Sequence, residues 1–180
     1  MTQASSDFEL TTDELRVVAR FAAESAQQVL PDYEADFPYD PRPCAALAAA
    51  LAFADGAPRT NLQRTAAVAA HRAAKEAGNE IAQLAGQACG DAAAAAYLHP
   101  LAKATQVGHI LRAAACAARI AKLHRDGDQT AAVEAINSAR ERAAPALLDV
   151  PQRYPPAPAG TSRVAQIMSA LDASLRRAGA

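Results

Sequence analysis

Apolar residues recur at every third or fourth position along most of the chain, a spacing that is typical of amphipathic helices. The first predicted helix begins behind Thr11, which forms a capping box with Glu14 three residues later. Pro31 is expected to kink or end this helix, because proline lacks the amide hydrogen that a helix interior needs. An acidic, proline-rich segment over 32–43 follows, and no stretch of the sequence alternates as a β-strand would.

Caps and helix breakers predict the remaining helices. They are expected to begin near Pro41, Thr60, Asn79, Pro100 and Asp128, and Thr60 with Gln63 forms a second capping box. A proline-rich connector over 151–160 then leads into a last helix, whose apolar stripe must be covered by the bundle or by a partner. That stripe consists of Val164, Ile167, Met168, Leu171 and Leu175.

Alanine dominates the composition, with 51 of the 180 residues, whereas aromatic residues make up only 4%. Alanine is the best helix former and leaves little side chain between neighbouring helices. Gly86 and Gly90, four residues apart, favour close approach of two backbones in the same way. The predicted fold is all-α, a single domain over 1–180 that forms a bundle of about six or seven closely packed helices.

Charge and cysteine content narrow the classes of function. A net charge of −1 and a pI near 6.4 provide no general attraction to nucleic acid. The N-terminus lacks the apolar core of a signal peptide, and no segment has the length and hydropathy of a membrane span. The cysteines, Cys44, Cys89 and Cys116, are odd in number and far apart, as in proteins of a reducing compartment. We therefore expect a cytoplasmic protein that binds neither nucleic acid nor membranes.

Common motifs of enzymes and metal centres are absent from the sequence. It contains no Glu-x-x-His pair, no Cys-x-x-Cys, no glycine-rich phosphate loop and no Gly-x-Ser-x-Gly turn. These absences favour a binding protein over an enzyme, and we expect no cofactor, no bound metal and no catalytic residue.

Residues 99–112 form the one unusually polar run. On a helix, His99, Lys103 and Gln106 would lie within about 60° of one another. Two interpretations stay open: both polar stripes are partly solvated, or one of them lines a pocket or an interface. The second stripe consists of Thr105, His109, Arg112 and Arg119.

Two residues on other predicted helices bear on this run. His71 is predicted on a basic, solvated face, and it would join the second stripe only if the two helices were neighbours. Asp91 is an isolated carboxylate in an alanine-rich helix. If Asp91 is buried, it requires a cation such as Lys103 or Arg112, because an unpaired buried charge is costly.

Four sequence stretches together resemble a family of small helical bacterial proteins known as putative immunity proteins, some of which are labelled as exonucleases. The resemblance covers about residues 8–176 and implies a cytoplasmic protein that binds and neutralises a toxin. Exonucleases of the ATPase class need a phosphate loop, which this chain lacks. The stretches are 40–43, 69–74, 99–109 and 153–158.

The family motifs mark a candidate binding set. One departure is Gly90-Asp91, where relatives often have Gly-His, and it argues against a histidine-based metal or catalytic site at this position. The positions that match the motifs are His71, His99, Lys103, Thr105, Gln106 and His109.

A second candidate surface is aromatic and acidic. Tyr33, Phe37 and Tyr39 lie among four carboxylates, a composition that would suit a basic nuclease toxin. The alternative is a plain loop whose aromatic side chains pack against the core.

Three functions remain open at this point. The first is an immunity protein that occludes a toxin. The second is a small-ligand-binding or enzymatic bundle with a pocket of His, Lys and Gln side chains. The third is a structural homo-oligomer assembled through the last helix.

Overall fold

The computed structural model describes residues 8–179, and within this range the chain forms only helices and loops. The all-α prediction is confirmed. Two short 3₁₀ turns, Ala95–Tyr97 and Ala104–Gln106, flank the loop between α4 and α5. The α-helices are α1 (Thr12–Asp36), α2 (Arg42–Ala54), α3 (Asn61–Glu76), α4 (Glu80–Ala94), α5 (Val107–His124), α6 (Gln129–Arg142), α7 (Pro145–Gln152) and α8 (Arg163–Ala178).

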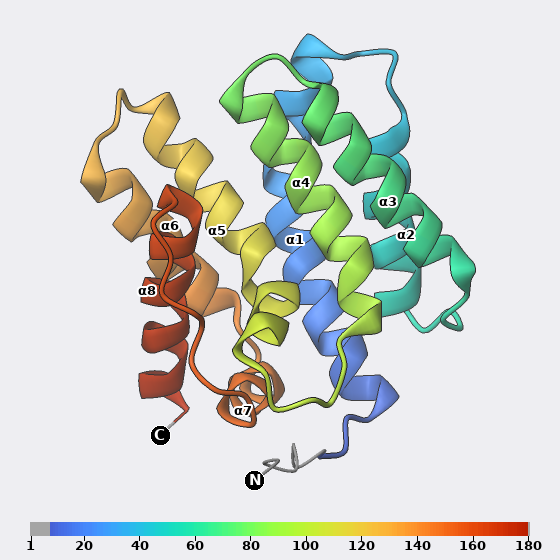
Figure 1. Ribbon diagram of the computed structural model, residues 1–180, viewed down its shortest axis with the longest axis vertical. Coiled ribbons are helices and arrows are strands. Elements are labelled where there is room, and N and C mark those ends of the chain that lie inside the picture. Colours follow the sequence, from blue (N-terminus) through green and yellow to red (C-terminus); the bar gives the residue numbers. More distant parts are fainter. Residues whose placement is uncertain (1–7, 180) are drawn as a thin grey trace, which may run out of the picture.

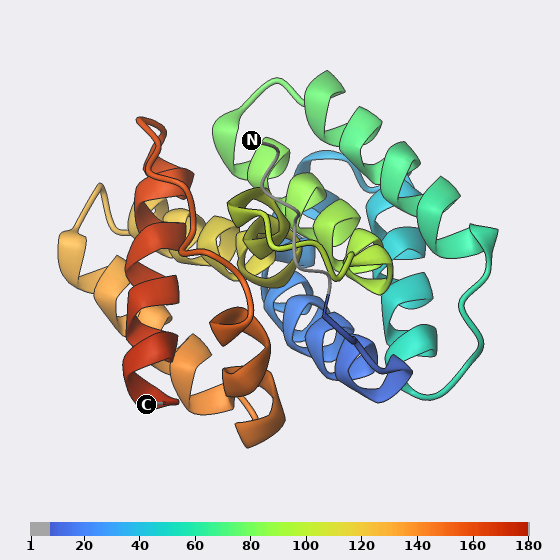
Figure 2. The same cartoon turned by 60° about the horizontal axis from the view of Figure 1, so that its bottom comes forward.

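Helix α1 lies at the centre of the molecule (Figure 1). It packs against α2, α4 and α5, and α4 also packs against α3 on its other side. The C-terminal helices α6 and α8 cover α5 on the side away from α2 and α3 (Figure 2). No helix within residues 8–179 has both the length and the apolar character that crossing a membrane requires.

Both predicted capping boxes are present. The Thr11 hydroxyl accepts a hydrogen bond from the Glu14 amide, while the Glu14 carboxylate accepts one from the Thr11 amide. Thr60 and Gln63 form the second box at the start of α3. These hydrogen bonds satisfy amide groups that the first helical turn leaves without partners.

The first helix does not end at Pro31. It continues to Asp36, so the predicted loop over 32–43 is shorter than expected. The Pro31 ring faces solvent, whereas Tyr33, one turn from the end of the helix, is buried with only 1% of its surface exposed. Burial of Tyr33 therefore offsets the backbone hydrogen bond that proline removes.

The prediction that residues 100–106 are helical is wrong. This segment is extended and ends in the Ala104–Gln106 turn, so α5 begins only at Val107. The Gln106 side chain accepts a hydrogen bond from the His99 amide at 3.1 Å. The Tyr154 hydroxyl donates to the His99 carbonyl at 2.8 Å. Tyr154 comes from the far end of the chain, and periodicity does not predict such long-range contacts.

One helix was missed by the sequence pattern. Helix α7 has only eight residues and contains two prolines, Pro145 in its first turn and Pro151 near its end. It includes the start of the predicted 151–160 connector; the rest of the connector has no helix. Buried Leu147 and Val150 attach α7 to the core.

The apolar stripe of α8 is covered by the chain itself. Ile167, Met168, Leu171 and Leu175 are buried, and α8 packs against α5, α6 and α7. This packing removes the observation that motivated the homo-oligomer hypothesis.

Helices α3 and α4 approach closely at a glycine. A Cβ atom added to Gly86 would lie 3.1 Å from Ala74 Cβ and 3.2 Å from Ala74 Cα. The neighbouring atoms belong partly to backbone, so they cannot move aside as a flexible side chain would. The close packing expected from the small residues is present at this crossing.

We predict that Gly86→Ala destabilises the protein by about 1–3 kcal/mol, because the methyl group forces α3 and α4 apart. Without this clash, alanine would stabilise a helix interior by roughly 0.5–1 kcal/mol. Urea unfolding measures the difference. The matched control is Gly78→Ala, where the added methyl group has no neighbour within 4 Å. An equal stability of the two variants would contradict the prediction.

Candidate functional site

Three polar side chains from three helices meet at one point. Asp91 of α4 is almost fully buried, with 2% of its surface exposed. Its Oδ1 atom accepts a hydrogen bond from Arg112 Nη1 of α5 at 3.3 Å and lies 3.5 Å from His71 Nε2 of α3. The expected pairing of a buried Asp91 with Arg112 is confirmed, whereas Lys103 lies outside this cluster.

Two glycines make room for the side chains that reach Asp91. Helix α4 lies between α3 and α5 (Figure 1), and His71 crosses it at Gly90. A Cβ atom on Gly90 would lie 2.9 Å from three atoms of the His71 ring. Gly108 precedes Arg112 by one helical turn, and a Cβ atom there would lie 2.2 Å from Arg112 Nη2. The His71 ring and the Arg112 guanidinium therefore occupy space that a side chain at Gly90 or Gly108 would fill.

Burial controls the protonation of the cluster. Burial raises the pKa of Asp91 from 3.8 to about 7, although the charge of Arg112 opposes this shift. Burial and the charges of Arg112 and Lys75 lower the pKa of His71. The second carboxylate oxygen, Asp91 Oδ2, is buried and has no hydrogen-bond partner among residues 8–179. The carboxylate is thus only half satisfied within the described structure.

His109 lies between this cluster and the loop that precedes α5. Burial lowers the pKa of His109, and the charges of Arg112, His99 and His71 lower it further. Its Nδ1 atom is also buried without a partner in the described part of the chain.

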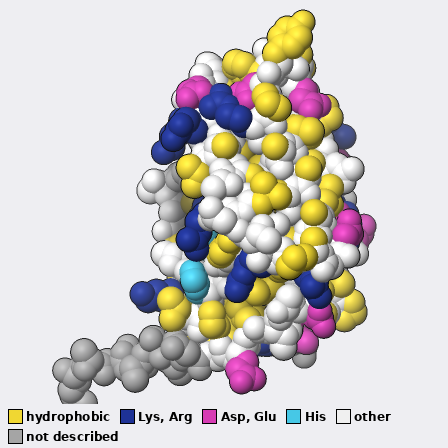
Figure 3. Space-filling view, turned by 90° about the vertical axis from the view of Figure 1, so that its right-hand side faces the viewer, with side chains coloured by type: hydrophobic (Ala, Val, Ile, Leu, Met, Phe, Trp, Pro, Cys, Tyr) yellow, Lys and Arg dark blue, Asp and Glu magenta, His cyan; other side chains and the backbone are white. Residues whose placement is uncertain are grey.

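Above the cluster, an open groove of about 640 Å³ runs over α3, α4 and α5. In the space-filling view of the α2 and α3 side (Figure 3), Lys and Arg side chains and a histidine gather toward one edge. The groove presents cationic and amide groups and no carboxylate among its lining residues, which are His71, Ala74, Lys75, Gln83, Gln87 and Arg112.

The predicted binding set is brought together only in part. His71 lines the groove and His109 lies near it, but Lys103 and Thr105 are exposed on the loop before α5. His99 and Gln106 bind each other on that loop. Of the set, only His71 lines this groove, and the segment from His99 to Lys103 that was to align the other side chains is not helical.

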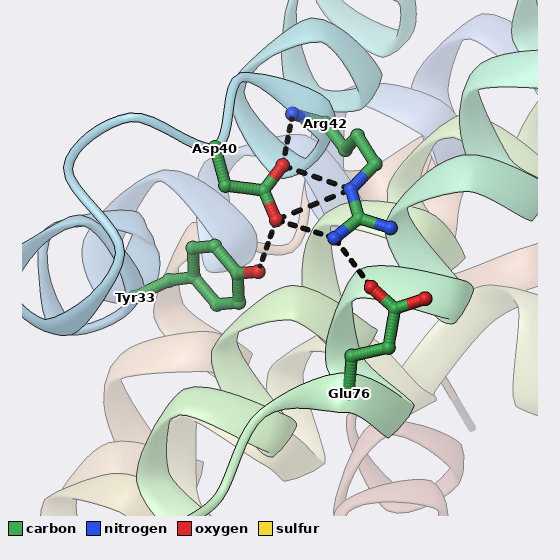
Figure 4. A network of polar contacts seen from close by, with 4 residues as sticks. All are labelled: Tyr33, Asp40, Arg42 and Glu76. Atoms are coloured by element: carbon green, nitrogen blue, oxygen red, sulfur yellow. Dashed lines mark hydrogen bonds and ion pairs between the residues drawn. The ribbon is translucent and has the colours of Figure 1, made fainter.

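The aromatic and acidic segment folds inward, as Figure 4 shows. The Tyr33 hydroxyl donates to Asp40 at 2.7 Å, and Arg42 bridges Asp40 and Glu76, each at 2.7 Å. Arg42 and Tyr33 hold the pKa of Asp40 well below its usual range. The network ties α1 and α2 to the end of α3.

Only one of the three predicted interface aromatics is available to a partner. Tyr33 is buried, so the prediction of an exposed anchor is wrong there, and Phe37 packs against the core. Tyr39 is 97% exposed. The side chains of Tyr33 and Phe37 therefore pack against the core as the alternative expected, although Tyr33 lies in α1 rather than in a loop.

Several groove residues were not recognised from the sequence. Lys75, Gln83 and Gln87 look like ordinary solvated positions in a helical pattern. Gly108, one turn before Arg112, was a usable signal because a glycine inside a helix usually has a packing reason. Within residues 8–179 no group of three or more His, Cys, Asp and Glu side chains could hold a metal ion.

Comparison with known proteins bears on this site. The model of the Imm-5 like putative immunity protein family matches residues 9–146. The chain belongs to this family. The match contains α1 to α6 and so the whole groove, whereas α8 lies beyond it. No curated protein and no solved structure matches the chain.

We predict a characteristic pH dependence of stability for Asp91→Asn. The folded chain holds the Asp91 proton up to about pH 7, whereas the unfolded chain loses it near 3.8. The stabilisation from Asp91 is therefore fully present below about pH 4 and is lost as the pH rises toward 7. Asparagine does not titrate, so the stability of the wild type relative to Asp91→Asn should fall over this range.

Urea unfolding of both proteins at several pH values measures this difference. His71 and His109 have lowered pKa values, so their contribution to stability increases as the pH rises. Both histidines are present in the two proteins, so the comparison cancels this contribution. A difference that stays constant with pH would contradict a raised pKa of Asp91.

Proposed function

We propose that this protein is an immunity protein that binds a bacterial toxin and neutralises it by occlusion. Membership of the Imm-5 like family over residues 9–146 is the observation that carries this proposal. The proposal includes a cytoplasmic location. Its support is that Cys44, Cys89 and Cys116 are free thiols, as expected in a reducing compartment.

We further propose that the groove over α3, α4 and α5 contacts the toxin. Its side chains project from helices rather than from loops, so little backbone conformational freedom is lost on binding. Arginine is enriched among the residues that dominate binding energy at interfaces, and Arg112 is half-exposed here.

The aromatic and acidic corner offers less to a partner. Asp32, Asp36 and Asp40 are bound to His124, Asn79 and Arg42, which leaves fewer free carboxylates for a basic toxin. Tyr39 is a single exposed aromatic rather than a patch. These contacts favour the groove as the binding surface.

A small-ligand-binding function is the second candidate. The groove volume of about 640 Å³ falls within the range of ligand sites. This candidate uses His71 with Lys75 and two glutamines, not the His99, Lys103 and Gln106 set predicted from the sequence.

Co-expression with the products of the genes that flank the gene for this protein, tested as candidate toxins, tests the proposal. The wild type should restore growth and should co-purify with the toxin. Lys75→Glu reverses a charge on the groove, and we expect it to weaken the complex by about tenfold. The matched control is Arg72→Glu, which reverses an exposed charge on the same helix outside the groove and should leave the affinity nearly unchanged.

Two results would contradict different parts of the proposal. Failure of the wild type both to rescue growth and to bind the toxin would refute the immunity function. Rescue with equal effects of Lys75→Glu and Arg72→Glu would show that the toxin contacts another surface.

A further inference from the structure

The chemistry of the groove selects for a negative ligand. Lys75 and Arg112 are cationic, His71 can become so, and Gln83 and Gln87 supply amide donors. The lining contains no carboxylate, and Gln83 Nε2 uses one of its two hydrogens on the Ala77 carbonyl at 2.8 Å, so the charged donors of Lys75 and Arg112 dominate the groove. Such a lining suits a carboxylate or phosphate group rather than a cation.

Arg112 has unused hydrogen-bonding capacity. A guanidinium group carries five N–H donors. Among residues 8–179, the Arg112 side chain donates one hydrogen bond, to Asp91 Oδ1 at a rather long 3.3 Å. The remaining donors are free to bind a group in the groove, which Arg112 lines.

Asp91 contacts the Arg112 guanidinium from the core side, whereas an external anion would contact it from the groove side. Asp91 is more than nine-tenths buried, and its Oδ2 atom has no hydrogen-bond partner within the described residues. The arrangement is a half-made ion pair, in which the carboxylate holds the cation through one oxygen only. Replacing this single-oxygen contact by an external anion costs less free energy than breaking a bidentate ion pair would.

We propose that the groove is an oxyanion site, in which a carboxylate or phosphate group binds Arg112, with Lys75 and His71 beside it, in competition with Asp91. The inference deepens the proposed function and rests on it for the source of the ligand, an acidic side chain of the toxin. A free anion of the same chemistry is the other source. Asp91 then acts as the internal anion that holds Arg112 in place while the groove is empty.

Ligand exchange is coupled to proton uptake from solvent. When Arg112 turns to the ligand, Asp91 loses the nearby positive charge and takes up a proton, since burial already raises its pKa to about 7. The ionisable groups around Asp91 are His71 and Lys75 from α3, and Arg112, His109 and Cys116 from α5. Because Asp91 already holds its proton below about pH 7, this coupling acts above that pH, and affinity should rise as the pH falls toward 7 from above. Protonation of His71 beside a bound anion acts in the same direction at lower pH.

Direct titration tests the site without the toxin. The probes are inorganic phosphate, acetate and an acetylated tetraglutamate peptide, with the ring signals of His71 followed by NMR. We expect saturable chemical-shift changes of the His71 ring, and we expect Arg112→Gln to lower the anion affinity obtained from them by about tenfold. Asp91→Asn removes the internal competitor, so it should bind several-fold more tightly and with less dependence on pH.

Gly108→Ala provides a second variant in case Arg112→Gln folds poorly. The new methyl group displaces the Arg112 guanidinium, which is the flexible end of a side chain, and the helix itself gains from alanine. Gly108→Ala should therefore fold and yet lose anion affinity. Gly78→Ala, in open space, is its matched control.

Each outcome bears on the inference. Shifts with the peptide identify an acidic side chain as the source of the ligand, and shifts with phosphate or acetate alone identify a free anion. No saturable shift with any probe, or equal binding by wild type and Arg112→Gln, would overturn the oxyanion site. Weaker binding by Asp91→Asn would overturn the competition. The growth-rescue experiment is independent of the titration. A negative titration therefore leaves the immunity function untouched, and a negative growth rescue leaves the oxyanion site untouched.

Discussion

Alanine and glycine leave so little side chain between α3 and α4 that a methyl group added at Gly86 or Gly90 would collide with α3, and one added at Gly108 of α5 would collide with Arg112. This close approach is what brings polar groups from α3 and α5 to the same point on α4. With ordinary core residues at Gly90 and Gly108, the His71 ring and the Arg112 guanidinium would be displaced from Asp91. The packing of small residues thus determines both the stability of the bundle and the position of its polar cluster.

The same packing explains the electrostatics of the cluster. Close-packed helices exclude water, so the Asp91 carboxylate loses hydration and its pKa rises to about 7. Arg112 and His71 stay half-exposed at the edge, where the groove admits solvent or a partner. A buried carboxylate below two half-exposed cationic or titratable side chains is an arrangement that can respond to what binds above it. The Asp40 network is different, because every oxygen of that carboxylate is bound and its role is to join helices (Figure 4).

Under the proposed function, the helices give the groove a rigid backbone on which a partner can bind, because helices position side chains more rigidly than loops do. The groove lies entirely within the part of the chain that matches the Imm-5 like family, whereas α8, which covers α5 from the other side, lies beyond the match. The C-terminal helix therefore contributes cover for the core rather than groove residues.

Local patterns were sufficient for the all-α class, for most of the helices and for the family, but not for α7 or for the end of α1 and the start of α5. The capping boxes at Thr11 and Thr60, the stripe of α8 and the burial of Asp91 against Arg112 all follow from short-range spacing or from the cost of a buried charge. The tertiary structure alone decided that residues 99–106 leave the helix, that Tyr33 turns inward, and that His71 reaches Asp91 across Gly90. These outcomes depend on contacts between residues far apart in the chain, such as Tyr154 with His99, and periodicity along one helix carries no information about which faces of different helices meet.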